Sequence, residues 1–159
     1  MLLAERPGDR YWALIEPHWL PLNEAWDLSL DEFLATLHQV PPRVADLYAA
    51  HWCQSEVRNG GFHQFFFNTT GLLAPEAVGG FRAIGLLEWA ALLAEAMNYF
   101  DAPYPRDRVM RLDLLPEDHD GDLENSDPFA ELDDRFFSCV DAEPTRWEKS
   151  ADLYAVQAA

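Results

Sequence analysis

The stretch from Glu56 to Gly71 gathers polar side chains that could form a binding site. Four phenylalanines stand among its carboxylate and amide groups, which are those of Glu56, Asn59, Gln64 and Asn68. Convergent polar groups beside an aromatic cluster could line a pocket for a small molecule or an enzyme site. Glu56 or Asn59 could instead accept hydrogen bonds from backbone N–H groups freed at the Gly60-Gly61 turn. We favour this structural interpretation because buried polar groups normally satisfy the backbone around them.

A second group of residues able to do chemistry is an acidic run from Leu112 to Asp134, which no lysine or arginine interrupts. If the run were helical throughout, it would carry one carboxylate per roughly 3.5 Å. One DNA strand carries a phosphate about every 3.4 Å, so this density would suit a surface that binds a DNA-binding protein. The ten acids are Asp113, Glu117, Asp118, Asp120, Asp122, Glu124, Asp127, Glu131, Asp133 and Asp134.

The same run has two other interpretations. Runs of charge are more often solvated faces that aid solubility than binding surfaces. Positions 1, 3, 5 and 12 of a calcium-type loop would fall on Asp120, Asp122, Glu124 and Glu131. Asn125 stands where such a loop needs glycine and Pro128 interrupts it, so we predict no metal site.

The remaining candidates for catalysis do not form a set. His51 and Cys53 are two residues apart, so on a helix they point to different faces and cannot share a zinc ion. His63 could pair with Glu56 as an acid and base, but nothing nearby completes a catalytic group. The sequence has no phosphate-binding glycine loop and no serine elbow. We therefore predict that the protein is not an enzyme and needs no cofactor.

Composition restricts the class of partner. The 159 residues carry 28 acidic against 11 basic side chains, which gives a net charge of −17. Such a charge repels nucleic acid and anionic membranes and attracts basic proteins. Cys53 and Cys139 lie in apolar helical patterns, where a free cysteine packs as a small hydrophobe, and no disulfide framework is indicated. With no apolar leader and no run of transmembrane length, we expect a cytoplasmic protein.

The elements that would position these groups are helices. The first half of the chain predicts a short helix over 10–16 that ends before Pro17, and a capping box at Ser29 and Glu32 predicts the start of a second. A long amphipathic helix from residue 42 leads to the Gly60-Gly61 turn, and a short helix follows it to residue 68.

The second half of the chain is also helical in pattern. The segments 75–84, 106–115 and 145–156 predict helices, as does a segment that begins at Asp127-Pro128. Gly79-Gly80 suggests a close approach of another backbone. The segment 86–100 is apolar almost all round and is expected at the centre. Because no run alternates with period two, the sequence predicts one compact all-α domain over 1–159.

The stretch from residue 56 to 71 also carries a family resemblance. Its pattern resembles the signature of a bacterial family of unassigned activity that includes the DNA-mimic protein nineteen. The residues that carry it are Glu56, Asn59, Gly60, Gly61, Phe62, Gln64, Phe66, Asn68 and Gly71. Further similarity at 83–85 and 132–137 extends the match over about 44–140, with short helical extensions on either side.

The resemblance implies an all-helical fold and, for the DNA mimic itself, a dimer whose surface carboxylates occupy the DNA-binding face of a transcription factor. We therefore expect an acidic module that binds a basic protein, such as a DNA-binding protein, through the ten acids named above. A small-molecule or enzyme site around residues 56–68 is one alternative. An inhibitor of a toxin, of the immunity-protein type, is another.

Overall fold

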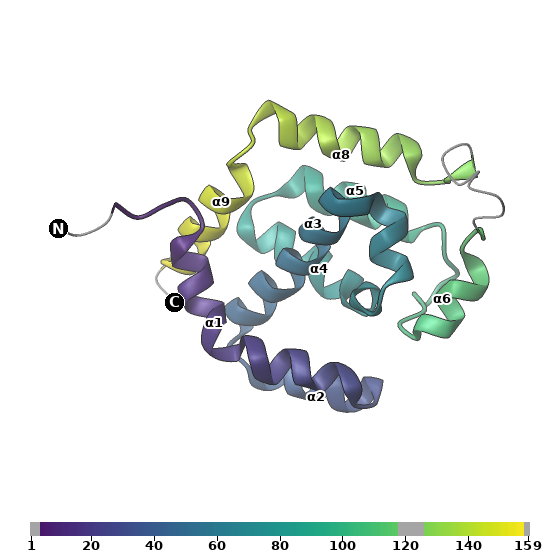
Figure 1. Ribbon diagram of the computed structural model, residues 1–159, viewed down its shortest axis with the longest axis horizontal. Helices are drawn as coiled ribbons and strands as arrows, with labels where there is room; N and C mark the ends of the chain where they lie inside the picture. The colour runs from purple at the N-terminus through teal and green to yellow at the C-terminus, as the bar shows by residue number, and fades with distance from the viewer. Residues whose placement is uncertain (1–3, 118–125, 158–159) are drawn as a thin grey trace.

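The computed structural model describes residues 4–117 and 126–157, which form helices and no strand. The α-helices among them are α1 (Asp9–Glu24), α2 (Leu30–Gln39), α3 (Pro42–Phe67), α4 (Ala74–Ile84), α5 (Leu87–Met97), α6 (Arg108–Leu114), α8 (Ala130–Ala142) and α9 (Arg146–Ala155). Figure 1 shows α1 and α2 along one side of the molecule, α8 along the opposite side and α6 at one end. The prediction of an all-α fold is confirmed.

The central helix is α3, which packs against α1, α2, α4, α6, α8 and α9. The prediction that the segment 86–100 would occupy the centre is wrong in this detail. Its helix, α5, leaves Leu87 66% exposed and also turns Glu88 and Glu95 to solvent. The other face of α5 packs on α4 and α8, so α5 is a helix of the periphery whose outer face carries Leu87 beside two glutamates.

Helix α1 continues through Pro17, where it was expected to end, and through Pro21. It runs from Asp9 to Glu24 with Pro17 and Pro21 inside, whereas the sequence predicted an end before Pro17. Both prolines are exposed, while Ile15 and Leu22 are buried. A proline removes one backbone hydrogen bond from the helix. Burial of the opposite face, which packs on α3, outweighs that loss.

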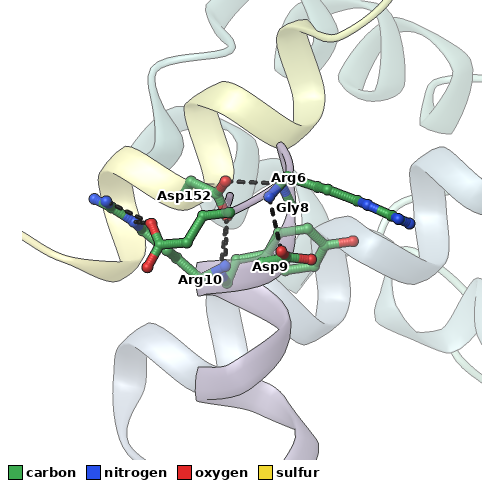
Figure 2. A network of polar contacts seen from close by, with 7 residues as sticks. Arg6, Gly8, Asp9, Arg10 and Asp152 are labelled. Carbon is green, nitrogen blue, oxygen red and sulfur yellow. Dashed lines mark hydrogen bonds and ion pairs between the residues drawn. The ribbon is translucent and has the colours of Figure 1, made fainter. Parts of the chain in front are cut away.

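The first turn of α1 is held by a residue from the far end of the chain. The carboxylate of Asp152 in α9 accepts hydrogen bonds from the backbone N–H groups of Gly8, Arg10 and Tyr11, at 2.7, 3.1 and 2.9 Å. Figure 2 shows this carboxylate above the start of α1. A helix N-terminus favours a negative charge because its first N–H groups lack partners in the helix. Asp152 therefore joins α9 to α1.

Two features of the middle of the chain agree with the sequence. Ser29 and Glu32 form the predicted capping box at the start of α2. A Cβ on Gly80 of α4 would lie 2.5 Å from the backbone oxygen of Asp46, so this glycine lets α4 approach α3 as predicted. Its neighbour Gly79 faces open space and has no such role.

Helix α8 begins at Ala130, two residues later than a helix with Asp127 as its cap and Pro128 as its first residue. Asp127 accepts a hydrogen bond from the N–H of Phe129 at 2.8 Å, which makes a local turn before the helix. None of the helices in the described residues is both long and apolar enough to cross a membrane.

Candidate functional site

Glu56 lies at the centre of the polar residues that the sequence singled out. It sits in α3 and is 9% exposed. Its Oε2 accepts hydrogen bonds from the amides of Gln64 and Asn68 at 2.6 and 3.0 Å. Its Oε1 accepts one from the hydroxyl of Thr70 at 3.0 Å. A carboxylate and three neutral donors thus form one network, which we call the Glu56 network.

The favoured interpretation, in which these groups cap the backbone of the glycine turn, is wrong for Glu56. Its carboxylate bonds to side chains. The amide of Asn59 donates to Oε1 of Gln64 at 3.1 Å, so it orients Gln64 without contacting Glu56 itself. The alternative expectation that Glu56, Asn59, Gln64 and Asn68 converge agrees with these contacts.

The turn itself is capped by a residue of the acidic run. Gly60 and Gly61 interrupt the helical backbone of α3, and Gly61 has a φ of 76°. The N–H of Phe62 then donates to Oδ1 of Asp133 in α8 at 2.8 Å. A Cβ on Gly61 would collide with that carboxylate, and a Cβ on Gly60 would collide with the amide of Gln64. The two glycines therefore permit both the kink and the contact with α8.

Asp133 has an altered acidity. Burial of its carboxyl raises the pKa, the hydrogen bond from Phe62 opposes that rise, and the nearby charges of Asp127 and Asp134 add to it, so that the pKa is about 6. Asp133 is half-buried. It is the member of the acidic run that the fold uses to fasten α8 to α3.

The backbone that follows α3 is held by a buried arginine. Arg111 of α6 is 0% exposed and donates to the carbonyl oxygens of Phe66 at 2.9 Å, Asn68 at 2.9 Å and Pro105 at 3.2 Å. It also donates to the carbonyl of Arg106. These carbonyls include the last ones of α3, which have no partner in the helix. No sequence motif marked Arg111.

Aromatic packing fixes the other side of the stretch. Phe62, Phe65 and Phe66 are fully buried, as the inward face predicted, while Phe67 is exposed. Phe66 packs against Phe100 and Phe129, with ring centroids 4.9 and 5.2 Å apart. Gly71 packs closely on this region. A Cβ at this position would lie 2.7 Å from the backbone oxygen of Phe65, so only glycine fits. The signature glycines and phenylalanines are therefore structural.

A pocket of about 350 Å³ opens over one side of the Glu56 network. We call it the hub pocket, and its lining residues are Trp26, Trp52, Glu56, Asn68, Thr69, Thr70 and Arg108. Of the four polar residues predicted to line a site, Glu56 and Asn68 line this pocket, whereas Asn59 and Gln64 do not. The two indoles come from distant segments, and their spacing in the sequence carries no sign that they meet here.

The acidic run is only partly described. Asp118, Asp120, Asp122 and Glu124 lie outside the described residues. Asp113, Glu117, Glu131 and Asp134 are exposed, while Asp127 and Asp133 are half-buried and accept hydrogen bonds from backbone N–H groups. Within the described residues no group of three or more His, Cys, Asp or Glu side chains is placed to hold a metal ion. Three positions of the calcium-type loop fall in the undescribed part.

The other candidate side chains for catalysis are buried or packed against aromatic rings. Burial raises the pKa of the Cys53 thiol well above its ordinary value, which disfavours the reactive thiolate. Burial lowers the pKa of His51 to about 4 among the rings of Tyr11, Trp12 and Trp19. His63 stacks on Phe67, with ring centroids 6.0 Å apart. Cys53 and Cys139 are both free.

Comparison with known proteins places the chain. The model of the DMP19-like protein family matches residues 38–157, which is most of the sequence. The chain belongs to the DMP19-like protein family. The matched span contains the Glu56 network and the acidic run, and it reaches beyond residue 140 to include α9. No curated protein and no solved structure matches the chain.

Membership of the DMP19-like family confirms the resemblance that the residues from Glu56 to Gly71 carry. It also indicates a protein of the DNA-mimic type. The buried residues of the signature hold α3 against α6 and α8. The exposed carboxylates of the described residues lie elsewhere, on the outer faces of the helices.

Proposed function

We propose that this member of the DMP19-like family binds a basic DNA-binding protein, such as a transcription factor, by presenting carboxylates where DNA would present phosphates. The observation that carries the proposal is the net charge of −17 on a chain of this family. Such a charge favours fast, salt-sensitive association with a positively charged partner and disfavours direct binding to nucleic acid. The family also favours a binding protein over an enzyme.

The outer face of α8 supplies a row of suitable groups. Glu131, Asp134 and Asp141 are exposed and recur on one stripe of the helix, which spans about 15 Å between the first and the last. Arg135 beside the stripe is paired with Glu95 of α5 at 3.1 Å. The three carboxylates are about 7.5 Å apart on average along the helix axis, which is sparser than the phosphates of one DNA strand. Asp113 of α6 is also exposed.

Capture of proteins from a bacterial extract tests the proposal. The immobilised chain should retain basic DNA-binding proteins at about 0.05 M salt and release them as the salt rises to about 0.5 M, because screening weakens exposed charge pairs. Added duplex DNA should release the same proteins by competing for their DNA-binding face. Retained proteins that are neutral or acidic, or that duplex DNA fails to displace, would contradict the proposal.

The oligomeric state is a separate part of the proposal. We propose a homodimer, as the family resemblance implies, since a symmetric pair would present two copies of the α8 row. Light scattering on the purified chain tests this directly. A mass equal to one 18.2 kDa chain at micromolar concentration would contradict it.

A further inference from the structure

We propose that the hub pocket binds a small molecule that carries an ammonium group, of the amino-acid type, with that group placed against Glu56. The hub pocket lies beside α3, and binding there would be independent of the acidic face of α8. It would add a ligand to a protein whose family points only to a protein partner.

The first observation is that Glu56 has no basic partner among the described residues. Its carboxylate is nine-tenths buried and accepts hydrogen bonds from Gln64, Asn68 and Thr70, all of which are neutral. No ion pair joins Glu56 to a basic residue within residues 4–117 and 126–157. A carboxylate removed from water without a positive partner is costly, and a cation that enters the adjacent pocket would relieve that cost.

The carboxylate also has room for another donor. Oε1 accepts a hydrogen bond from Thr70 alone among the described contacts, whereas a carboxylate oxygen can accept about two. The donors that orient it are themselves fixed, because Arg111 holds the carbonyl of Asn68 and Asn59 holds the amide of Gln64. A ligand would therefore meet a carboxylate that is already positioned, which limits the entropy lost on binding.

The walls of the pocket suit the rest of such a ligand. Trp26 and Trp52 line it, and indole faces attract cations and cover apolar groups. Their rings lie 6.4 Å apart between centroids at an angle of 88°, so they present two different surfaces to the cavity. The volume of about 350 Å³ lies in the range typical of small-molecule sites.

Arg108 narrows the class of ligand. Among the described residues that line the pocket, it is the one with a basic side chain. Its Nε donates to the carbonyl of Phe67 at 2.8 Å and its guanidinium lies over the Phe67 ring, 5.1 Å from the centroid, which holds it in place. A carboxylate on the ligand would be attracted to Arg108, whereas a second positive charge would be repelled. A free amino acid carries both required groups.

Calorimetry and NMR with free amino acids test the proposal. The common amino acids are screened against the whole chain, and the tightest binder is compared with its amide and its N-acetyl derivative. We expect the free amino acid to bind best, the amide to bind several-fold more weakly and the N-acetyl form not to bind. The indole N–H signals of Trp26 and Trp52 should shift while that of Trp147 stays in place.

Variants connect the binding to the pocket. Glu56→Gln should weaken binding at least about tenfold, since a hydrogen bond to a charged group is among the stronger ones. Because this change also alters the Glu56 network, a second variant changes none of the network's side chains: Thr69→Tyr fills the pocket from an exposed position and should abolish binding. Thr145→Tyr, also exposed and without a side-chain capping bond, is the matched control and should bind normally.

The outcomes that would overturn the proposal are specific. One is that no free amino acid binds. Another is that the N-acetyl form binds as well as the free amino acid, which would remove the role of the ammonium group. A third is that Thr69→Tyr, shown by circular dichroism to be folded, binds as tightly as Thr145→Tyr.

Discussion

At the scale of the residue, Glu56 is the common acceptor of three side-chain donors. Removing its carboxylate leaves the amides of Gln64 and Asn68 and the hydroxyl of Thr70 without their acceptor. We expect Glu56→Ala to lower the free energy of unfolding by about 2–4 kcal/mol, because buried donors without acceptors each cost about 1–3 kcal/mol and some will reach water through the pocket.

Urea unfolding followed by circular dichroism measures this loss. Glu131→Ala is the control, since Glu131 is exposed on α8 and its removal should change stability by less than about 0.5 kcal/mol. Equal midpoints for the two variants would show that the Glu56 network does not contribute to the fold.

Asp133 makes the stability of the protein depend on pH in an unusual direction. In the folded chain the carboxyl of Asp133 stays protonated up to about pH 6, whereas an ordinary aspartate in the unfolded chain loses its proton near pH 4. The folded state therefore binds more protons between these values, and the contribution of Asp133 favours folding at acidic pH and is lost as the pH rises through 6.

Asp133→Asn tests this sign. Asparagine keeps an acceptor oxygen for the N–H of Phe62 and cannot ionise. We expect the variant to gain about 1–2 kcal/mol relative to the natural chain between pH 4 and pH 7, a value reduced from the full shift to allow for solvent screening. Urea unfolding at both pH values measures the difference. A stability difference that stays constant with pH would refute the assignment.

The partners of these two carboxylates could not be predicted from the sequence. Spacing on a helix indicated that Glu56 and the nearby amides could meet, but it could not decide between backbone and side-chain partners. Asp133 lies 71 positions from Phe62 and was grouped with the exposed acids. Arg111 had no signal at all, because an arginine that holds carbonyls has no charged partner to search for.

At the scale of the element, the kink of α3 decides where α8 can dock. Gly61 has a φ of 76° and leaves no room for a Cβ against Asp133. We expect Gly61→Ala to destabilise the fold by more than about 2 kcal/mol, because it combines backbone strain with a collision. Thermal unfolding followed by circular dichroism measures it.

Gly79 of α4 provides a matched control for that prediction. It is exposed, lies within a helix and has no atom near the position of a Cβ. Gly79→Ala should therefore stabilise the protein by about 0.5–1 kcal/mol through helix propensity. If Gly61→Ala were as stable as Gly79→Ala, the kink would not require glycine.

Local signals predicted the elements well wherever the backbone alone decides. The capping box at Ser29, the glycine turn after residue 59 and the close approach at Gly80 all follow from local chemistry, and the structure has all three. The predicted end of α1 was wrong because burial of the helix's inner face outweighs the two prolines on its outer face. The prediction that the segment 86–100 is central was wrong because the apolarity of a segment alone does not reveal which elements will surround it.

At the scale of the whole molecule, charge and family point in the same direction. A net charge of −17 disfavours nucleic acid as a direct partner, and membership of the DMP19-like family indicates a DNA-mimic type. Which carboxylates meet the partner depends on which of them are exposed together, and the fold decides that. Asp133 shows why, since it lies in the acidic run and yet fastens two helices.

The measurement that tests the central proposal most directly compares two variants with equal changes of charge. One carries Glu131→Gln, Asp134→Asn and Asp141→Asn on the outer face of α8. The other carries Glu24→Gln, Asp27→Asn and Asp31→Asn, which are exposed where α1 leads into α2. These two helices lie on the opposite side of the molecule from α8 (Figure 1). Each variant is immobilised, and the DNA-displaceable protein that it retains from a bacterial extract is quantified.

We predict that the α8 variant retains less than about a tenth of the DNA-binding protein that the natural chain retains. The control variant should retain most of it, because a long-range effect of net charge is screened beyond about 8–10 Å at physiological salt. Equal retention by the two variants would contradict a binding surface on α8 and would leave the acidity of this protein as a general property of its surface.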